Sequence, residues 1–313
     1  MEENSRIYVA GHRGLVGSAI WRQLEARGHR QLHGRIRPEL DLRDWEQTRA
    51  FFEEVRPEYV LNAAGKVGGI HANNQLPVDF LEDNLRMEIN LVRAAHEFGV
   101  KRFLFLGSSC IYPREAENPI SEDALLSGAL EKTNEPYAIA KITGIQLCDA
   151  YRRQHGSDFF SVMPCNLYGP GDNYHPENSH VLPAMIRRFH EAKESRAPEV
   201  VCWGSGTPRR EFMFGDDLGD ACCFLMDVPE VPNIINVGYG KDISIRELAE
   251  LVADVVGFEG GIEWDSTRPD GTIRKLIDSQ RVRELGWSPK TGLREGLEIT
   301  YKAFLASKVV REK

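Results

Sequence analysis

The stretch VAGHRGLVGSAI, residues 9–20, decides the fold of this chain. Its apolar start predicts a β-strand, Gly11 and Gly14 predict a tight turn, and the residues around Gly17 have the spacing of an amphipathic helix. Such a turn lets the backbone approach a pyrophosphate, which then lies over free N–H groups at the positive end of the helix. The third glycine allows the helix to pack closely on the sheet. The stretch therefore predicts a dinucleotide-binding turn, against the alternative of an ordinary glycine turn.

The residues that follow indicate which dinucleotide is bound. An NAD site places an acidic residue about 20 residues after the turn, where it binds the ribose hydroxyls, whereas a 2′-phosphate requires arginine. Arg35 and Arg37 stand where the acid would be, and Arg13 lies in the turn itself. This pattern favours NADP, unless the arginines belong to an exposed, solvated loop. Asp41 and Leu42 are candidates to flank the adenine.

Farther out, the first half of the chain alternates short apolar runs with helical patterns. Strands are predicted at 6–10, 58–62, 102–107 and 159–164, and helices at 15–27, 78–97 and 137–153. Strands that are apolar throughout suit a parallel sheet that is covered on both faces. The prediction is an α/β protein with a doubly wound parallel sheet of the Rossmann type.

The composition of the sequence and the lengths of the predicted strands change after residues 166–173. Proline, glycine and asparagine become more frequent, and short strands at 200–203 and 233–238 accompany a helix at 244–256. We therefore expect a dinucleotide-binding domain in residues 1–166, to which later segments return. A smaller, partly interleaved α/β substrate-binding domain is expected to consist mainly of residues 167–313.

Composition narrows the partners that this chain can have. The net charge of −8 and the pI near 5.7 argue against binding to nucleic acid or to an anionic membrane. No apolar run approaches the ~20 residues that span a bilayer, and the start of the chain lacks the pattern of a signal peptide. The six cysteines include no C-x-x-C pair and indicate reduced thiols. We expect a soluble, cytoplasmic protein without a bound metal.

A Tyr/Lys pair carries the second candidate site. In PYAIAK, residues 136–141, Tyr137 and Lys141 lie four residues apart on one face of a predicted helix. A nearby ammonium lowers the pKa of a phenol, so this arrangement suits proton exchange by Tyr137 near neutral pH. The alternative is an ordinary pair on a solvated helix face.

A cysteine follows the third predicted strand, in LGSSCIYP, residues 106–113. Ser108 lies at the carboxyl end of that strand, where open α/β sheets bind ligands. If the chain stays extended, Ser108 and Cys110 face one pocket and Ser109 faces away. The alternative for Cys110 is a buried packing residue, which is the usual role of a free cysteine.

Several motifs together resemble those of one enzyme family. They are GHRGLVGSAI, KVGGI, GSSCIYP, NEPYAIAK, NLYGPGDN, NSHVLPAMIRRFHEA, WGSGTPRREF and RPDGTIRKLID. They run over essentially the whole chain and resemble GDP-L-fucose synthases, the GDP-4-keto-6-deoxymannose 3,5-epimerase/4-reductases of the extended short-chain dehydrogenase/reductase superfamily. The glycine turn and the Y-x-x-x-K pattern indicate only the superfamily, whereas the cysteine in GSSCIYP and the NSHV segment are much more specific.

The resemblance implies a GDP-sugar substrate with a ketone at C4 and stereocentres at C3 and C5. Cys110 and His180 are the implied acid/base pair for inverting both centres, since thiols and imidazoles exchange protons around neutral pH. Without the resemblance, His180 would be taken as a surface or capping residue. Hydride from NADPH is then expected at C4 while Tyr137 protonates the oxygen and Ser108 steadies it. Lys141 is implied to lower the pKa of the tyrosine and to hold the nicotinamide ribose.

The resemblance also implies the binding residues. Those for the cofactor are Gly11, Arg13, Gly14, Leu15, Val16, Gly17, Arg35, Arg37, Asp41, Leu42, Ala63, Ala64, Tyr137, Lys141, Pro164, Leu167 and His180. Those for the substrate are Asn166, Arg188, Trp203, Arg210 and Lys275, with the two arginines on the diphosphate. The alternatives are a core position for Trp203, a turn for Asn166 and solvated faces for the charged residues. The family also suggests a homodimer packed through helices.

Four residues, in three places, depart from the family pattern. Gly65 stands where alanine is usual beside the cofactor, and Cys165 is uncommon. Phe214 and Gly215 replace a histidine or tyrosine followed by valine. We expect the glycine at 65 to loosen the cofactor face, and the change at 214–215 to alter a loop near the substrate.

Two other functions remain open. A nucleotide-sugar 4-epimerase or dehydratase on the same scaffold would retain NAD without net redox change. It predicts an acid where Arg35 or Arg37 lies and does not need Cys110 and His180. A redox-sensing regulator that has lost catalysis would lack the Tyr/Lys pair, which is present.

Overall fold

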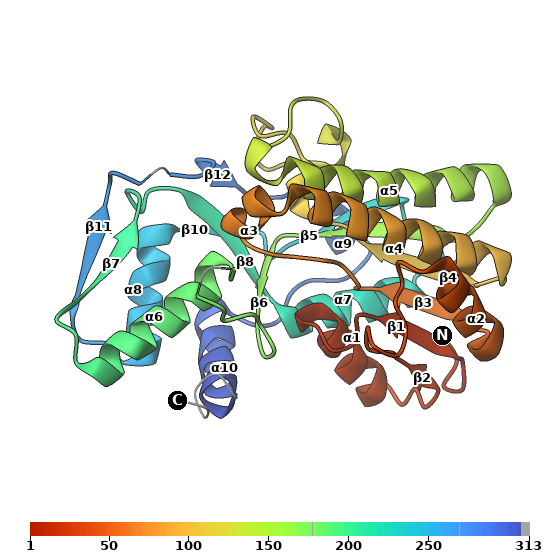
Figure 1. Ribbon diagram of the computed structural model, residues 1–313, viewed down its shortest axis with the longest axis horizontal. Coiled ribbons are helices and arrows are strands. Elements are labelled where there is room, and N and C mark those ends of the chain that lie inside the picture. Colours follow the sequence, from red (N-terminus) through yellow and green to blue (C-terminus); the bar gives the residue numbers. More distant parts are fainter. Residues whose placement is uncertain (177, 269, 308–313) are drawn as a thin grey trace.

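A six-stranded parallel sheet forms the centre of the molecule, seen in a computed structural model that describes residues 1–176, 178–268 and 270–307 (Figure 1). Its strands are β1 (Ile7–Ala10), β2 (Leu32–His33), β3 (Tyr59–Asn62), β4 (Arg102–Leu106), β5 (Phe159–Pro164) and β9 (Ile234–Val237). They lie in the order β2-β1-β3-β4-β5-β9, and every neighbouring pair is parallel. Because β2 and β3 lie on opposite sides of β1, the strand order reverses there, and such sheets bind ligands at this reversal.

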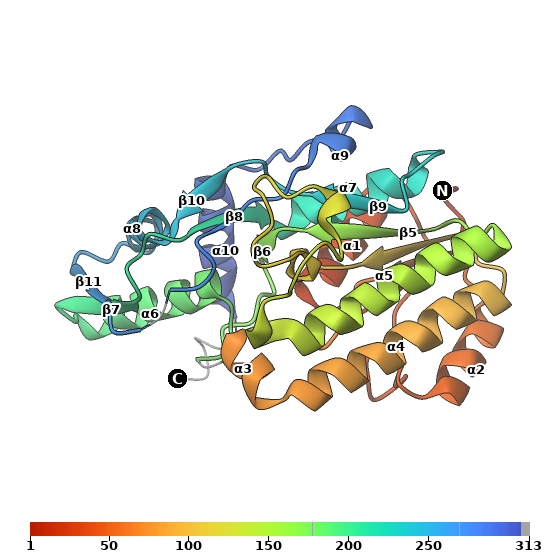
Figure 2. The same cartoon turned by 90° about the horizontal axis from the view of Figure 1, so that it is seen from above.

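Helices cover both faces of this sheet. The first face carries α2 (Trp45–Val55), α4 (Pro77–Glu97) and α5 (Glu135–His155), and the second carries α1 (Leu15–Ala26) and α7 (Gly215–Asp227), as Figures 1 and 2 show. Every residue of β1, β4 and β5 is buried, which is why these strands are apolar apart from Arg102 and Ser161. The predicted doubly wound parallel sheet is confirmed.

Local signals set the ends of the helices on the first face of the sheet. Pro77 and Pro136 lie in the first turns of α4 and α5, where the fixed φ of proline favours a helix start. Gly156 ends α5 in the left-handed conformation, with φ of 68°. Asp44 caps α2 by accepting a hydrogen bond from the backbone N–H of Gln47 at 3.0 Å.

A smaller α/β part lies beside the sheet (Figure 1). Its strand β8 (Arg209–Phe214) pairs with β6 (Asn166–Tyr168), β10 (Asp242–Ser244) and β12 (Arg274–Lys275), and β7 (Glu199–Trp203) pairs with β11 (Gly261–Asp265). Its helices are α6 (Val181–Ser195), α8 (Ile245–Val256) and α10 (Leu293–Ala306). Phe189, Leu248 and Phe304 belong to a hydrophobic core of its own.

The two parts are interleaved along the chain. Residues 233–238, which the sequence pattern assigned to the smaller domain, instead contain β9 and extend the large sheet beside β5. Val282 of α9 (Gln280–Glu284) and the nearby Trp287 also pack into the large core. The remaining elements are α3 (Ile70–Gln75), η1 (Ser109–Ile111), η2 (Glu122–Ala124) and η3 (Lys132–Asn134). Among the described residues, no helix has the length and apolar character needed to cross a bilayer.

Candidate active site

The glycine turn after β1 is closed by contacts that leave no room for side chains. Gly11 has φ of 75°, and a Cβ there would lie 2.8 Å from the carbonyl oxygen of Ala63 and the backbone nitrogen of Ala64. A Cβ on Gly17 would lie 2.1 Å from the carbonyl oxygen of Gly11. Gly14 is the N-cap of α1 and has only a 3.4 Å contact. The helix therefore starts directly against the turn, and its first N–H groups fit a pyrophosphate.

Leu15, in the first turn of α1, shows where one departure from the family pattern lies. Its Cδ1 is 3.3 Å from the Cβ position built on Gly215 and equally close to that built on Gly169. Phe214 is buried and its ring centroid lies 5.8 Å from that of Tyr168. Gly215 thus packs against the first turn of α1 and Phe214 belongs to the core of the smaller part, while an altered loop near the substrate stays a prediction. Val16 is half-buried in the same first turn.

Arg13 and Arg35 converge on one imidazole. Burial lowers the pKa of His12, and the charges of Arg13 and Arg35 lower it further. A Cβ on Gly34 would lie 2.5 Å from His12 Cγ, so the imidazole is fixed between the turn and the segment after β2. Two cations around one point fit the extra phosphate of NADP.

The remaining predicted adenosine-side residues form an ion network. Arg37 is exposed, with its Nε 3.9 Å from Asp41 Oδ2. Asp41 is held more tightly by Arg43, whose Nη2 lies 2.6 Å from the same oxygen, and hydrogen bonds from Arg43 lower the pKa of Asp41 to about 2. Leu42 is buried behind this pair. Arg37 is thus the predicted cofactor arginine that best fits the solvated-loop alternative.

Ser108 and Cys110 lie together after β4, for a reason other than the one the sequence suggested. The chain is not extended there, because Ser109–Ile111 form the 3-10 turn η1. Ser108 caps this turn, and its Oγ accepts a hydrogen bond from the backbone N–H of Cys110 at 3.2 Å. Ser109 is buried, whereas Ser108 and Cys110 remain half-buried. The turn places both Ser108 and Cys110 near Tyr137, and their sharing of one pocket stays a prediction.

Tyr137 completes this group from α5. Its side chain is buried in a cluster with Phe80, against which Cys110 packs. Burial raises the pKa of Tyr137, the charges of Cys110 and Glu88 raise it further, and a hydrogen bond with the Ser108 side chain lowers it. The Ser108 hydroxyl, the Cys110 thiol and the Tyr137 phenol therefore lie close together between β4 and α5, where all three can contact one small substrate group.

Lys141 faces the sheet rather than the phenol. Its Nζ donates a hydrogen bond to the carbonyl oxygen of Leu106 at 3.0 Å and lies 3.2 Å from Glu88 Oε1. The sequence predicts that Lys141 lowers the pKa of Tyr137, but in this structure burial outweighs every lowering contribution. A Cβ on Gly65 would lie 3.6 Å from Lys141 Nζ, so the departure at 65 borders this lysine.

His180 lies at the seam between the two parts. It is the N-cap residue of α6 and is exposed, yet the surrounding protein atoms lower its pKa by desolvation. The preceding loop contacts the segment before α3, where the backbone N–H of Gly69 donates to the carbonyl oxygen of Asn178 at 3.1 Å. Ala72 of α3 in turn packs with Tyr137 and Cys110. The contacts that link His180 to Cys110 thus run through residues 68–72.

The predicted substrate residues gather around β7 and β8. Trp203 is 65% exposed at the end of β7, which rules out the core position, and Arg188 donates a hydrogen bond to the carbonyl oxygen of the neighbouring Val201. Arg210 and Lys275 are register partners on β8 and β12. Burial lowers the pKa of Arg210, whose Nη1 donates to the carbonyl oxygen of Arg209 at 2.8 Å.

Three further residues lie where β5 passes into β6. Asn166 is a strand residue rather than a turn residue, and its Nδ2 donates to the carbonyl oxygen of Glu211 at 2.9 Å. Pro164 ends β5 in a buried position, and Leu167 is half-buried on β6. This junction connects the large sheet to the smaller part beside the candidate site.

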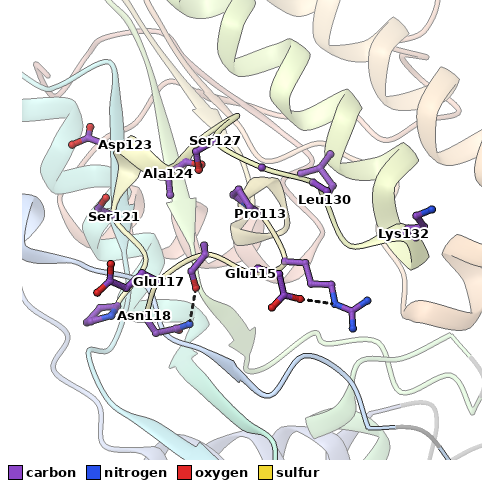
Figure 3. Close-up of a pocket in the computed structure, with 15 residues that line it drawn as sticks. Pro113, Glu115, Glu117, Asn118, Ser121, Asp123, Ala124, Ser127, Leu130 and Lys132 are labelled. Carbon is purple, nitrogen blue, oxygen red and sulfur yellow. Dashed lines mark hydrogen bonds and ion pairs between the residues drawn. The ribbon is translucent and has the colours of Figure 1, made fainter.

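A hollow of about 770 Å³ lies in the loop that follows Cys110, and Figure 3 shows its lining. The loop satisfies several of its own polar groups, with Arg114 Nε 3.3 Å from Glu115 Oε1 and Asn118 Nδ2 donating to the carbonyl oxygen of Ala116 at 3.2 Å. Its lining consists of residues 113–119, 121, 123–124, 127–130 and 132, which include none of the predicted site residues. We therefore place the candidate site at the carboxyl ends of β1 and β4, called the crevice below, and not in this hollow.

Two polar residues on the buried stripe of α4 were missed by sequence reasoning. Asn84 accepts a hydrogen bond from the backbone N–H of Lys66 at 2.8 Å, and Glu88 lies behind Lys141. Both alternate with Phe80 and other apolar residues at helical spacing. A carboxylate on an apolar stripe was the signal that could have found them.

This arrangement belongs to the dinucleotide-dependent oxidoreductases and epimerases that are built on a Rossmann sheet, with a glycine turn after one strand and catalytic hydroxyls after another. The chain belongs to the NAD dependent epimerase/dehydratase family, which it matches over residues 7–238.

Individual relatives define its place in that family more closely. The chain is 57% identical to GDP-L-fucose synthase 1 of Arabidopsis thaliana, over 97% of this chain and 94% of the relative. It is 53% identical to GDP-L-fucose synthase of Escherichia coli, over 96% of each chain. The solved structure of a GDP-L-fucose synthetase from Naegleria fowleri bound to NADP has a TM-score of 0.90 at 28% identity, covering 100% of this chain and 98% of that one. The resemblance predicted from the sequence is confirmed.

Proposed function

We propose that this protein converts GDP-4-keto-6-deoxy-D-mannose into GDP-L-fucose by epimerisation at C3 and C5 and NADPH-dependent reduction at C4. Relatives that carry the name GDP-L-fucose synthase match nearly the whole chain. The observation that carries the proposal is the Cys110 thiol against Tyr137 and beside Ser108. A ketone held by the two hydroxyls would lie next to a group that exchanges carbon-bound protons.

Epimerisation uses the acidity of the carbons beside the ketone. Loss of a proton from C3 or C5 leaves a carbanion that delocalises onto the carbonyl oxygen, which Ser108 and Tyr137 hold. Inversion then requires a base on one face of the sugar and an acid on the other, and Cys110 and His180 supply them. Desolvation lowers the pKa of His180, so its imidazole is neutral at pH 7 and can accept a proton.

Reduction uses the same hydroxyls. Bound NADPH supplies the hydride that converts the C4 ketone into an alcohol. Tyr137 donates its phenolic proton to the C4 oxygen, and Ser108 stabilises that oxygen. Because burial raises the pKa of Tyr137, the phenol keeps its proton until the oxygen becomes strongly basic. Lys141 holds the nicotinamide ribose, while Gly11, Arg13 and Arg35, with their neighbours, hold the phosphates.

The substrate diphosphate needs positive charge that the overall acidic protein does not provide by itself. Arg188 and Arg210 supply it, with Asn166, Trp203 and Lys275 along the rest of the sugar nucleotide. For Arg210, desolvation is the single cause of its lowered pKa, and no carboxylate of the described residues offsets it. A bound diphosphate would provide the missing partner.

The quaternary structure and compartment belong to the same proposal. We infer a homodimer through α4 and α5, since Ile89 and Ile139 are 45% and 42% exposed on these two helices. Six free thiols suit a reducing cytoplasm. Residues 1–166, with the segments that return to them, are proposed as the NADP-binding domain, and 167–313 mainly as the substrate-binding domain.

The test supplies GDP-4-keto-6-deoxymannose with NADPH and follows the absorbance of the reduced nicotinamide. Oxidation of NADPH with formation of GDP-L-fucose is expected. A folded protein that binds NADPH but leaves it unoxidised contradicts the proposal. Epimerisation without cofactor consumption would instead support an NAD-retaining 4-epimerase.

Replacement of the thiol tests the epimerisation step separately. In Cys110→Ser we expect deuterium exchange from solvent at C3 and C5, and product formation, to fall by about 100-fold or more, the usual contribution of a general acid or base. NADPH affinity should stay unchanged. Ser109→Ala is the matched control, because Ser109 is the buried neighbour of Cys110 in the same turn, and it should keep near-wild-type exchange. Unchanged exchange in Cys110→Ser would remove the thiol from the mechanism.

A further inference from the structure

A buried carboxylate stands behind the lysine of the Tyr/Lys pair. Glu88 Oε1 lies 3.2 Å from Lys141 Nζ, and the two side chains are 2% and 4% exposed. Glu88 belongs to α4 and Lys141 to α5, the two helices that lie side by side on one face of the sheet (Figure 2). The Glu88–Lys141 ion pair is therefore almost completely shielded from solvent.

The surrounding residues hold this carboxylate in one place. A Cβ on Gly144 would lie 3.0 Å from Glu88 Oε2 and 2.3 Å from Phe105 Cζ, so only glycine leaves room for the Glu88 side chain. Asn84, one turn earlier on α4, fixes the backbone of Lys66 by one accepted and one donated hydrogen bond, at 2.8 and 3.1 Å. One face of α4 therefore positions both the segment after β3 and the ammonium of Lys141.

Stability does not explain the pair. Neither Oε1 nor Oε2 of Glu88 has a hydrogen-bond partner among the described residues, and Oε1 is held by its ion pair with Lys141. Burial raises the pKa of Glu88 to about 7, although the charge of Lys141 opposes this rise. Buried ion pairs are poor sources of stability, since apolar residues of similar volume often replace them without loss. A role in the chemistry of Lys141 accounts better for a carboxylate that is so costly to bury.

The ammonium of Lys141 has two polar partners, and its remaining open direction is toward the cofactor side. Its Nζ donates to the carbonyl oxygen of Leu106 at 3.0 Å and meets Glu88 on another side. The Phe105 ring closes a further direction, with its centroid 4.7 Å from Nζ. The ammonium is left to act toward Gly65 and the crevice, where the Cβ position of Gly65 lies 3.6 Å away.

We propose that Glu88 is a positioning residue of the reduction step, which holds the ammonium of Lys141 against the end of β4 so that it meets the cofactor ribose beside Gly65. The inference rests on the proposed function, because it assigns Lys141 to the reduction. Epimerisation by Cys110 and His180 does not need this support. Glu88 also acts on the phenol, since its charge is one of the causes, after burial and Cys110, that raise the pKa of Tyr137.

The experiment compares Glu88→Gln, Glu88→Asp and Glu88→Leu with wild type in three measurements. These are kcat for NADPH oxidation, NADPH affinity from nicotinamide fluorescence, and deuterium exchange at C3 and C5 with saturating NADP+, which cannot reduce the substrate. Thermal unfolding establishes that each variant is folded. Glu82→Gln is the matched control on α4, because Glu82 is exposed and, within the part of the chain that the structure describes, forms an ion pair only with Arg86 one turn away.

A role in positioning Lys141 and a role of negative charge alone predict different rankings of the three variants by their loss of kcat. Glutamine keeps an acceptor oxygen at the same reach, whereas aspartate keeps the charge but is one methylene shorter. We expect kcat for reduction to fall about 3-fold in Glu88→Gln and about 30-fold in Glu88→Asp and Glu88→Leu, corresponding to lost transition-state stabilisation. NADPH affinity should fall in the same order, and exchange should stay within about 3-fold of wild type.

Several results would overturn the proposal. One is folded variants with wild-type kcat and NADPH affinity, and another is a larger loss in Glu88→Gln than in Glu88→Asp. An equal fall of exchange and reduction would show a general structural effect instead. If Glu88→Leu does not fold, the other two variants decide. If wild type itself neither oxidises NADPH nor exchanges, the proposed function fails, while the NADPH affinities still test the placement of Lys141.

Discussion

The two sides of the crevice are built in different ways. On the cofactor side, a single stretch at residues 9–17 forms the site by leaving side chains out, so that backbone groups approach the ligand. On the substrate side, the predicted residues come from segments far apart in the sequence and lie on or beside two sheets, one with β6, β8 and β12 and the other with β7. Cofactor binding therefore depends on positions without side chains in the glycine turn, whereas substrate binding depends on the charged ends of long side chains. A substitution should therefore act sterically on one side and electrostatically on the other.

The largest effect is expected from filling the tightest backbone contact. In Gly17→Ala the new Cβ would lie 2.1 Å from the carbonyl oxygen of Gly11, so α1 must move away from the turn. We expect the free energy of unfolding to fall by about 2 kcal/mol, as for other overpacked sites. NADPH affinity should fall by about 100-fold, the cost of misplacing binding groups by an ångström. Chemical denaturation and nicotinamide fluorescence measure the two quantities.

Gly14→Ala is the matched control for this steric effect. Its Cβ would meet the carbonyl oxygen of Gly11 at 3.4 Å, an ordinary contact, and Gly14 is an exposed N-cap residue without a positive φ. The change in unfolding free energy should stay within about 1 kcal/mol. Equal destabilisation by both alanines would mean that close packing at 17 does not distinguish the two glycines.

On the substrate side, removal of one charge should separate substrate binding from cofactor binding. Arg210→Gln is expected to raise KM for the GDP-sugar by about 10- to 100-fold, since a hydrogen bond to a charged group contributes about 1.5–3 kcal/mol. NADPH affinity should stay unchanged. Steady-state kinetics at several salt concentrations measure the effect, which should shrink as salt screens the remaining charges.

Arg274 is the neighbouring arginine that serves as the control. It precedes Lys275 on β12, is exposed, and its Nε forms a hydrogen-bonded ion pair with Asp242. Because successive residues of a strand face opposite sides, Arg274 points away from the face that Lys275 presents. Arg274→Gln should leave KM unchanged, and a comparable rise in both variants would argue against a specific diphosphate contact at Arg210.

The same difference explains how much of the fold the sequence reveals. The predicted strand at 102–107 matches β4, and the predicted helices at 78–97 and 137–153 match α4 and α5 within two residues. Each of these is a contiguous pattern with its own start and stop. The assignment of 233–238 to the smaller domain failed because the sheet that a strand joins is set by its partner, here β5, far away in the sequence.

The site divides in the same way. Ser108, Cys110 and Tyr137 were predicted from local motifs, and the structure brings them together. The reason given for the orientation of Cys110 was wrong, because three residues after a strand can turn as η1 without a distinct sequence pattern. Glu88 was missed because its partner, Lys141, lies on another helix and pairing across helices leaves no local spacing.

The smallest effect is expected where this chain departs from its family beside the cofactor. The sequence suggested that Gly65 loosens the cofactor face. A Cβ at this exposed position would lie 3.4 Å from Asn84 Oδ1 and 3.6 Å from Lys141 Nζ, which are ordinary contacts. Gly65→Ala should therefore keep kcat and NADPH affinity within about 2-fold and raise the unfolding free energy by about 0.5 kcal/mol, by restricting the unfolded chain.

Gly144→Ala shows what a filled contact near the same lysine would do. Its Cβ would lie 2.3 Å from Phe105 Cζ and 3.0 Å from Glu88 Oε2, so helix α5 must shift and the Glu88–Lys141 pair with it. We expect a loss of about 2 kcal/mol in unfolding free energy and slower NADPH oxidation. If Gly65→Ala instead slows reduction as much as Gly144→Ala does, a side chain at position 65 disturbs Lys141 or the cofactor more than its distances indicate. The segment after β3 would then need a residue without a side chain, as the glycine turn does.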